Sequence, residues 1–213
     1  MKKCIAAGVA LACCVVFSAC GKAGKPGEIT GTITIAVGEV TVNGKLAKAN
    51  DTVKFGDVIE TKKDAKCRII VDGQNVIETW KESLLVFKLT QGDGLLELKS
   101  GSMGALLKNL KKVKEFRVTT QTVAAGIRGT AFCINAETPD KTYTCTCNGK
   151  VAYKAEGQGK ETVISAAHHK AAYYERVDGK IKDKEAGMLY HTDAKMEELA
   201  SSIGVKIDWG KAE

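Results

Sequence analysis

Short stretches in which apolar and polar residues alternate dominate the chain from residue 30 to about residue 174. In Thr32–Val37, for example, threonines alternate with apolar, mostly β-branched residues. A period of two buries one face of a strand, so such stretches predict β-strands, typically about five residues long. The other predicted strands are Val40–Val42, Asp57–Glu60, Ala65–Val71, Val76–Trp80, Leu84–Leu89, Leu95–Leu98, Phe116–Thr120, Ala131–Asn135, Thr142–Cys147, Val151–Lys154 and Lys170–Arg176.

Turn-forming dipeptides separate these strands. Asn43-Gly44, Asp72-Gly73, Asn148-Gly149 and Asp178-Gly179 are all typical of tight turns, in which the backbone adopts positive φ. Many short strands at close spacing predict an all-β fold: a compact roll or sandwich, or a short β-solenoid.

The pattern changes to a helical period near the C-terminus. In Thr192–Ala200, a Thr or Asp can cap the helix and acidic residues lie in the first turn, with Gly204 as the stop. Apolar residues at Met196, Leu199 and Ile203 would then face the β body. The sequence therefore predicts a short C-terminal α-helix, and it suggests a second short helix over Met103–Leu110.

The N-terminal segment has the pattern of an export signal. Lys2 and Lys3 precede an apolar run over 4–17, which is shorter than the roughly twenty residues that a membrane-spanning helix needs. This run matches the hydrophobic region of a signal peptide. Ser18-Ala19-Cys20 resembles the lipobox of bacterial lipoproteins, although Phe17 stands where leucine is usual. The resemblance implies cleavage before Cys20 and a diacylglycerol on its sulfur, which would anchor the protein to a membrane.

These features divide the chain into four predicted parts. Residues 1–19 form the signal peptide, and 20–29, rich in Gly and Lys, form a flexible tether. A β domain covers 30–155, and a β extension with the C-terminal helix covers 156–213. The composition, with 44% hydrophobic and 27% charged residues, is that of an ordinary globular protein.

Charge gives little support for nucleic-acid binding. The net charge of +7 includes Lys2 and Lys3 of the signal segment. The densest basic stretch, Lys108–Lys114, contains no aromatic residues that could stack on bases. The sequence predicts no nucleic-acid partner.

The cysteines outside the predicted signal segment offer a chemical site. Of the eight cysteines, the four that remain in the body are Cys67, Cys133, Cys145 and Cys147. In an oxidising compartment, four cysteines can form two disulfides, or some of them can bind a metal.

A metal site is favoured by the C-terminal half of the sequence. Cys145 and Cys147 would share one face of a strand, about 7 Å apart along the chain, which permits both sulfurs to bind one ion. All the histidines of the chain follow them: His168, His169 and His191. Two cysteines and two histidines are a common zinc ligand set, and zinc or iron are the metals expected here. Because His168 and His169 are sequential, only one of them would join the cysteines unless a turn intervenes.

Two alternatives remain open at this stage. If the chain folds back near Pro139 or Asp140, Cys133 lies opposite or diagonal to Cys145 or Cys147, and a cross-strand disulfide could form. Plain buried thiols are the other alternative. A disulfide between Cys145 and Cys147 is disfavoured, because their Cα atoms would be farther apart than the usual 5.5 Å or so.

Five segments of the chain share the pattern of a known family. They are Val37–Gly44, Gly56–Thr61, Cys67–Gly73, Leu95–Gly101 and Gly126–Phe132. The last of them, Gly-Ile-Arg-Gly-Thr-Ala-Phe, is the most specific. Together they resemble the FecR domain, an extracytoplasmic β domain of ferric-citrate regulators and of many envelope proteins. The Cys-x-Cys, His-His and His-Thr-Asp pattern also resembles the tail of some envelope FecR-domain proteins.

The Gly-Ile-Arg-Gly-Thr segment has a mechanical interpretation. Gly126 and Gly129 would allow a close strand approach or positive φ, Arg128 could cap buried carbonyls, and Thr130 would begin a core strand. A ligand-binding role of Arg128 is the alternative. The segment lacks the spacing of a phosphate-binding loop, so nucleotide binding is not expected.

The chain also departs from the regulators of this family. Those regulators carry a cytoplasmic segment and a membrane helix before the domain, whereas a signal segment and a lipid anchor are predicted here. We therefore expect a non-catalytic, lipid-anchored protein on the periplasmic or outer-membrane face of the cell envelope, with binding, sensing or scaffold function. It would not contact a cytoplasmic sigma factor, and signalling would need an envelope protein partner. A metal- or redox-centre carrier is the alternative, while no catalytic motif supports an enzyme.

Overall fold

The computed structural model describes residues 27–108 and 113–212. The predicted signal peptide, Cys20 and most of the tether lie outside these residues. The elements are β1 (Gly31–Val37), β2 (Val40–Val42), β3 (Lys45–Leu46), β4 (Thr52–Val53), β5 (Val58–Thr61), β6 (Lys66–Val71), β7 (Asn75–Thr79), β8 (Ser83–Leu89), β9 (Gly92–Leu107), β10 (Val113–Thr119), β11 (Val123–Thr138), β12 (Lys141–Ala155), β13 (Thr162–Ala166), β14 (Lys170–Val177), β15 (Lys180–Ala186) and α1 (Asp193–Ser201).

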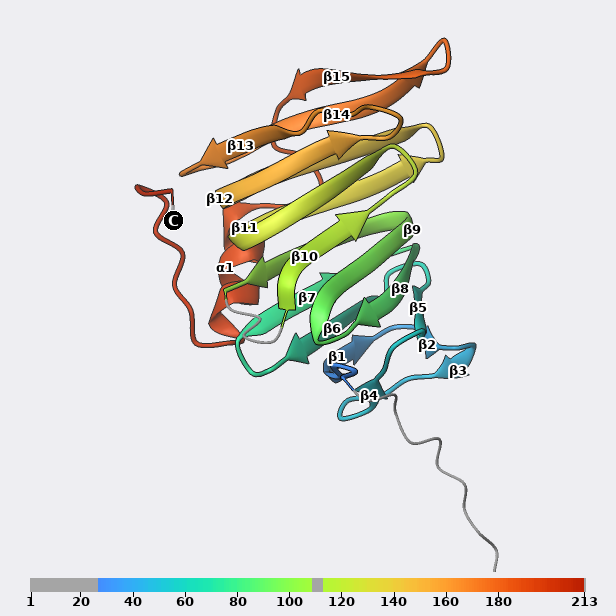
Figure 1. The fold of residues 1–213 in the computed structure, drawn as a ribbon. Helices are drawn as coiled ribbons and strands as arrows, with labels where there is room; N and C mark the ends of the chain where they lie inside the picture. The colour runs from blue at the N-terminus through green and yellow to red at the C-terminus, as the bar shows by residue number, and fades with distance from the viewer. Residues whose placement is uncertain (1–26, 109–112, 213) are drawn as a thin grey trace, which may run out of the picture.

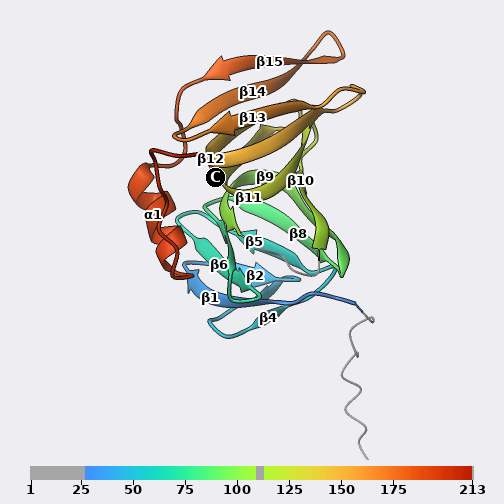
Figure 2. The same cartoon turned by 60° about the vertical axis from the view of Figure 1, so that its left-hand side comes forward.

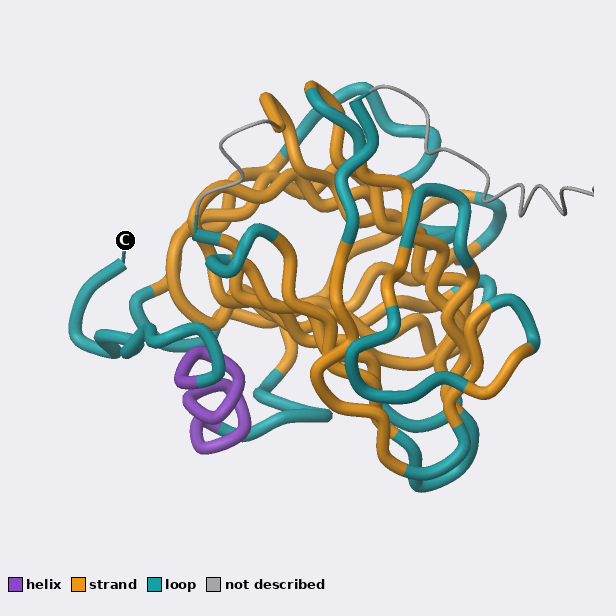
Figure 3. The backbone as a smooth tube through the Cα atoms, turned by 90° about the horizontal axis from the view of Figure 1, so that it is seen from below, coloured by secondary structure: helices purple, strands orange, loops and turns teal. Residues whose placement is uncertain are grey.

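All of these strands belong to one curled sheet (Figure 1). Its main path runs β15-β14-β12-β11-β10-β9-β7-β6-β1-β4, and β2, β3, β5, β8 and β13 attach along the side of this path. Seen from below, the strands curl around the interior while the single helix lies outside them (Figure 3). The predicted all-β class and C-terminal helix are confirmed.

Three strands are much longer than the alternation predicted, and each changes partners along its length. β9 pairs with β8 and, in parallel, with β10 through its first half, then with β7 and β11 through its second half. The change occurs around Gly101, whose φ is +76°. A Cβ there would lie 2.4 Å from the carbonyl oxygen of Glu82, so only glycine fits without movement. β11 and β12 change partners in the same way near Gly129 and Gly149.

The sheet buries side chains on both faces, and this creates two apolar clusters. Along β11, Phe132 and Ile134 join the larger cluster inside the roll, while Ala131 and Cys133 join a second cluster on the opposite face. Successive side chains of a strand point to opposite faces, so a central strand buried on both sides has a continuous apolar sequence.

This double burial explains an error of the sequence analysis. The predicted helix over Met103–Leu110 is wrong, because Gly92–Leu107 is the continuous strand β9 and residues 109–112 lie outside the described part. Met, Ala and Leu favour helices, but here Ala105 and Leu106 pack into clusters on opposite faces of the sheet. Tertiary packing overrides the local propensity.

The helix α1 covers the second cluster from outside the sheet (Figure 2). Its N-cap is Thr192, whose hydroxyl accepts a hydrogen bond from the Lys195 backbone N–H at 3.2 Å. Met196 and Leu199 point into the cluster and are fully buried. Within the described residues, no helix has the length and apolar character that crossing a membrane would require.

Candidate metal centre

Strand β12 provides two thiols on the face that α1 and the C-terminal segment cover. Cys145 and Cys147 are both fully buried, and their sulfur atoms lie 3.9 Å apart. This spacing follows from the strand, because residues i and i+2 point to the same face. The expected common face of the two cysteines is therefore present.

The turn between β13 and β14 brings one histidine to these thiols. His169 has a φ of +35°, and its backbone N–H donates to the carbonyl oxygen of Cys147 at 3.0 Å. This conformation directs its Nδ1 to within 3.5 Å of the Cys145 Sγ. The preceding His168 is about half exposed and contributes no atom to the group around the sulfurs.

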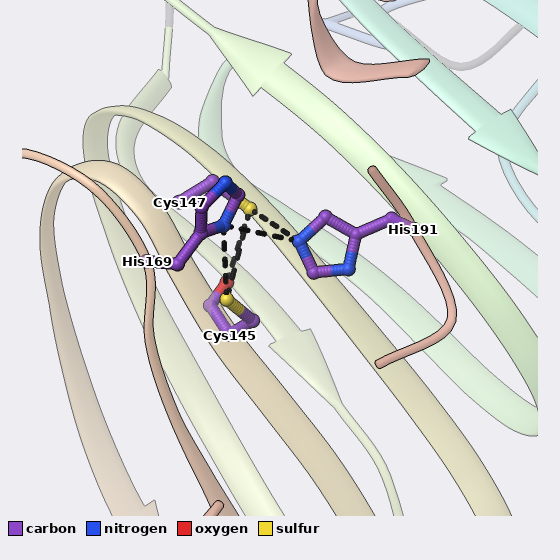
Figure 4. A group of neighbouring side chains, drawn as sticks. All are labelled: Cys145, Cys147, His169 and His191. Carbon is purple, nitrogen blue, oxygen red and sulfur yellow. Dashed lines mark hydrogen bonds between the residues drawn. The ribbon is translucent and has the colours of Figure 1, made fainter. Parts of the chain in front are cut away.

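The connection between β15 and α1 provides a second histidine. The Nε2 of His191 lies 3.2 Å from the Cys147 Sγ and 3.2 Å from the His169 Nδ1 (Figure 4). The ligand atoms of these four residues all lie within 4.8 Å of one another. Of the five metal ligands that the sequence suggested, the structure thus brings together Cys145, Cys147, His169 and His191.

Outer contacts orient both imidazoles toward the shared centre. The His169 Nε2 donates to the Asp193 carboxylate at 2.7 Å, and the His191 Nδ1 donates to the Leu189 carbonyl at 2.7 Å. Because both acceptors lack protons, each neutral ring carries its proton on the outer nitrogen and directs a lone pair inward. Metal-binding histidines characteristically have such a carboxylate or carbonyl partner.

Two lone pairs that face each other at 3.2 Å repel, and a cation between them would remove the repulsion. A tetrahedral ion with bonds of about 2.3 Å to sulfur and about 2.0–2.1 Å to nitrogen spaces its ligands at about 3.8 Å for S–S, about 3.5 Å for S–N and about 3.3 Å for N–N. The S–S distance here is 3.9 Å, the N–N distance is 3.2 Å, and the Cys145–His169 and Cys147–His191 distances are 3.5 Å and 3.2 Å. These four distances are close to those around a single tetrahedral ion, and the other two S–N distances are at most 4.8 Å.

The same distances argue against a two-iron cluster. A cluster with two cysteines and two histidines holds the sulfurs on one iron and the nitrogens on the other, which separates the two pairs. Here the Cys147 Sγ and the His191 Nε2 are only 3.2 Å apart. The arrangement favours one ion over a cluster.

Without an ion, the two thiols titrate differently. The hydrogen bond from Cys147, assisted by the histidines, lowers the pKa of Cys145, while burial raises the pKa of Cys147. Burial alone would lower the pKa of His169, but the contacts with Cys145 and Asp193 outweigh it and the pKa is raised. The lowered pKa favours the thiolate form of Cys145, which is the form in which cysteine binds metals.

The other cysteines of the body take no part in this group. Cys133 pairs with Cys145 across the β11–β12 hairpin, which turns at Pro139 and Asp140 as the disulfide alternative assumed. All four cysteines of the described residues are nevertheless free thiols in the structure. Cys67 belongs to the larger apolar cluster, on the other face of the sheet.

The Gly-Ile-Arg-Gly-Thr segment lies in β11 and contributes no residue to the group of four candidate ligands. Gly129 has a φ of +54°, and the buried Thr130 donates its hydroxyl to the carbonyl oxygen of Lys150 at 2.7 Å. Gly126 lies opposite Ala152 in the β11–β12 ladder. The side chain of Arg128 lies outside the described part, so its predicted carbonyl-capping and ligand-binding roles both remain hypotheses.

The sequence analysis did not recognise Asp193 as a partner of the histidines. Its carboxylate accepts from His169 at 2.7 Å and from His168 at 2.9 Å. In the sequence it appeared only as an acidic residue at the start of a helix. The His-Thr-Asp sequence of residues 191–193 was the available signal, because it places a carboxylate two positions after a potential ligand.

Comparison with known families finds a match to the middle of the chain. Residues 57–152 match the family model described as FecR protein. This segment is therefore similar to FecR domains, and we refer to it as the FecR domain below. It contains Cys145 and Cys147, whereas His169 and His191 follow it. The four candidate ligands therefore come in equal number from the matched segment and from the chain that follows it.

Solved structures share part of this fold. Two crystal structures, each described as a candidate anti-sigma factor from Parabacteroides distasonis, superpose with a TM-score of 0.50 at 14% and 15% identity. Each match covers 60% of this chain and 59% of the compared chain. At this identity the likeness concerns the fold. No curated protein matches the sequence.

Proposed function

We propose that this chain is a non-catalytic, extracytoplasmic FecR-domain protein that uses a structural zinc ion to attach its C-terminal extension to the domain. The convergence of four ligand atoms within 4.8 Å carries this proposal. All four positions of a tetrahedral ion would be filled by protein, which is typical of structural sites, whereas catalytic zinc keeps one position open.

The wider role that we propose is sensing or scaffolding in the cell envelope. The FecR match supports it, and so does the fold shared with structures described as candidate anti-sigma factors. A lipid on Cys20 would hold the body outside the cytoplasm. A signal would then reach the cytoplasm through a membrane-spanning protein partner, because the body itself could not contact a sigma factor.

Metal analysis of the mature chain tests the centre. We expect about one zinc per chain in the wild type, none in Cys147→Ser, and an unchanged content in the control His168→Ala, whose imidazole is exposed and outside the group. Substitution with cobalt should give the intense visible bands of a tetrahedral ion with thiolate ligands. Absence of metal from the wild type, or its loss from the control alone, would refute the centre.

The analysis also separates zinc from redox metals. If the protein instead contained stoichiometric iron or copper, with a spectrum that changes on reduction, the result would favour a role in electron transfer over a structural one. A disulfide between Cys133 and Cys145 in metal-free wild-type protein would support the disulfide alternative instead. Thiol counting under denaturing conditions distinguishes these results.

The lipid anchor needs a separate test. In cells fed with a labelled fatty acid, the wild type should incorporate the label and fractionate with membranes. Cys20→Ser should lose both properties, since the thioether can form only on the cysteine sulfur. An unlabelled wild type that is released with the soluble envelope proteins would contradict the anchor but leave the metal centre untouched.

A further inference from the structure

The helix α1 rests on a face of the sheet that we call the α1-docking face, formed by Val76, Trp80, Leu106 and Ala131. The C-terminal segment contributes Met196, Leu199 and Ala200 to the same apolar cluster. The helix has nine residues, and a helix this short has little stability of its own in water. Its position therefore depends on what holds it against the sheet.

A polar contact holds the middle of the helix. The Glu198 carboxylate accepts from Arg68 at 2.6 Å and lies 3.7 Å from the Lys66 ammonium. Arg68 is itself buried and also bonds Glu78 at 2.6 Å. The α1-docking face thus presents an apolar surface with a fixed cation beside it.

The start of the helix is held through the metal centre. His191 immediately precedes the N-cap, and Asp193, the first helical residue, bonds the ligand His169. The centre would therefore tie three separate segments together: β12, the β13–β14 turn and the entry to α1. Without the ion, His169 still bonds the Cys147 carbonyl and Asp193, and Tyr143 of β12 still bonds the connection between β15 and α1. The ion would add to these contacts the bond that fixes His191.

We propose that the metal regulates access to the α1-docking face. With the ion bound, α1 covers the face. When the ion is removed, α1 leaves and the face accepts a helix of a protein partner with the same chemistry, an apolar stripe with an acidic residue that meets Arg68 and Lys66. The template is α1 itself, and the mode is the docking of an amphipathic helix on an apolar surface. This inference rests on the proposed metal centre.

Hydrogen exchange on the full mature chain tests the first half. Metal is removed with a chelator and restored with zinc, and exchange is followed in α1 and in β6. We expect the amides of α1 to exchange about tenfold faster or more without metal, which corresponds to about 1.4 kcal/mol of lost docking free energy. The amides of β6 should stay protected, which shows that the domain remains folded.

A labelled peptide of residues 192–209 tests the second half. It should bind the metal-free chain and be displaced when zinc is restored, while a peptide with Glu198→Lys should bind at least about tenfold more weakly because it repels Arg68. The metal content is measured on the same samples. A wild type that holds no metal refutes the proposed centre.

If the wild type binds metal but removal of the metal leaves amide exchange in α1 unchanged, the regulation is refuted and the metal centre is not. Faster exchange without peptide binding refutes the docking of a partner helix. His191→Ala provides the second route to the released state. It should bind the peptide without chelator, whereas His168→Ala should not.

Discussion

Replacement of His191 by alanine should abolish the stabilisation of the protein by zinc. A ligand that binds only the folded state contributes about 2.7 kcal/mol at a free concentration one hundred times its dissociation constant. For a chain of this size, one kcal/mol shifts the midpoint of thermal unfolding by about 2–4 °C. The wild type should therefore unfold about 5–11 °C higher with buffered zinc than with chelator.

His191→Ala removes the Nε2 that lies 3.2 Å from the Cys147 Sγ, and leaves only three protein donors. Most of the zinc-dependent shift should disappear. His191 is also 7% exposed, so its truncation costs stability with or without metal. For this reason the comparison uses the difference between the zinc and chelator midpoints of each variant, measured by circular dichroism, and not the midpoints themselves.

The matched control is His168→Ala, which removes a neighbouring imidazole that bonds Asp193 but lies outside the group of donors. Its zinc-dependent shift should equal that of the wild type. Equal shifts in the wild type and His191→Ala would refute the assignment of His191 as a ligand. If the zinc-dependent shift were lost in His168→Ala but kept in His191→Ala, His168 and not His191 would be the ligand.

Three further predictions concern the scaffold. Glu78→Ala should lower the free energy of unfolding in urea by about 3–5 kcal/mol, because it leaves the charge of Arg68, whose side chain is 6% exposed, without its buried partner; a loss below about 1 kcal/mol would contradict this. Gly101→Ala should lower the free energy of unfolding in urea by more than Gly157→Ala does. Both glycines have positive φ, but only at Gly101 would a Cβ meet the backbone. Equal losses in the two variants would count against the bend in β9. The hydrogen bond from Arg68 lowers the pKa of Glu198, so its stabilisation is complete above the unfolded pKa of about 4.3 and is lost as the pH falls through the lower folded value. After correction for the pH dependence of the intrinsic exchange rate, the protection of the α1 amides should therefore fall more steeply below about pH 4 in the wild type than in Glu198→Gln, and identical profiles would exclude this contact.

The alternation of apolar and polar residues predicted the positions of most strands but not the lengths of the central strands. β1 and β14 have one mixed or solvated face, so polar residues mark their period and their positions agree with the prediction. The second half of β9 is buried on both faces, and Met103–Leu107 therefore contains no polar residue to mark a period of two. A single sequence cannot distinguish such a strand from a buried helix by pattern alone.

The candidate site could be predicted by residue type but not by geometry. Cys-x-Cys on a strand implies two sulfurs on one face, and this holds for Cys145 and Cys147. The choice between His168 and His169 depends on a backbone φ of +35° at His169, a conformation that histidine adopts infrequently and that the sequence does not reveal. The contribution of Asp193 depends on the same turn and was missed for the same reason.

The position of the centre at the edge of the FecR domain bears on how it could act. The family match ends at residue 152, so two ligand residues belong to the domain and two belong to the extension. Strand β12 pairs with β11 within the domain and with β13 and β14 of the extension, so the sheet remains continuous without any ion. What the proposed ion would add is a further attachment of the segment after β15, which has no strand pairing of its own and is otherwise held by side-chain contacts such as that of Glu198 with Arg68. Loss of the ion should therefore act on α1 first and on the FecR domain least, and this difference in stability is what a metal-dependent change of partner would require.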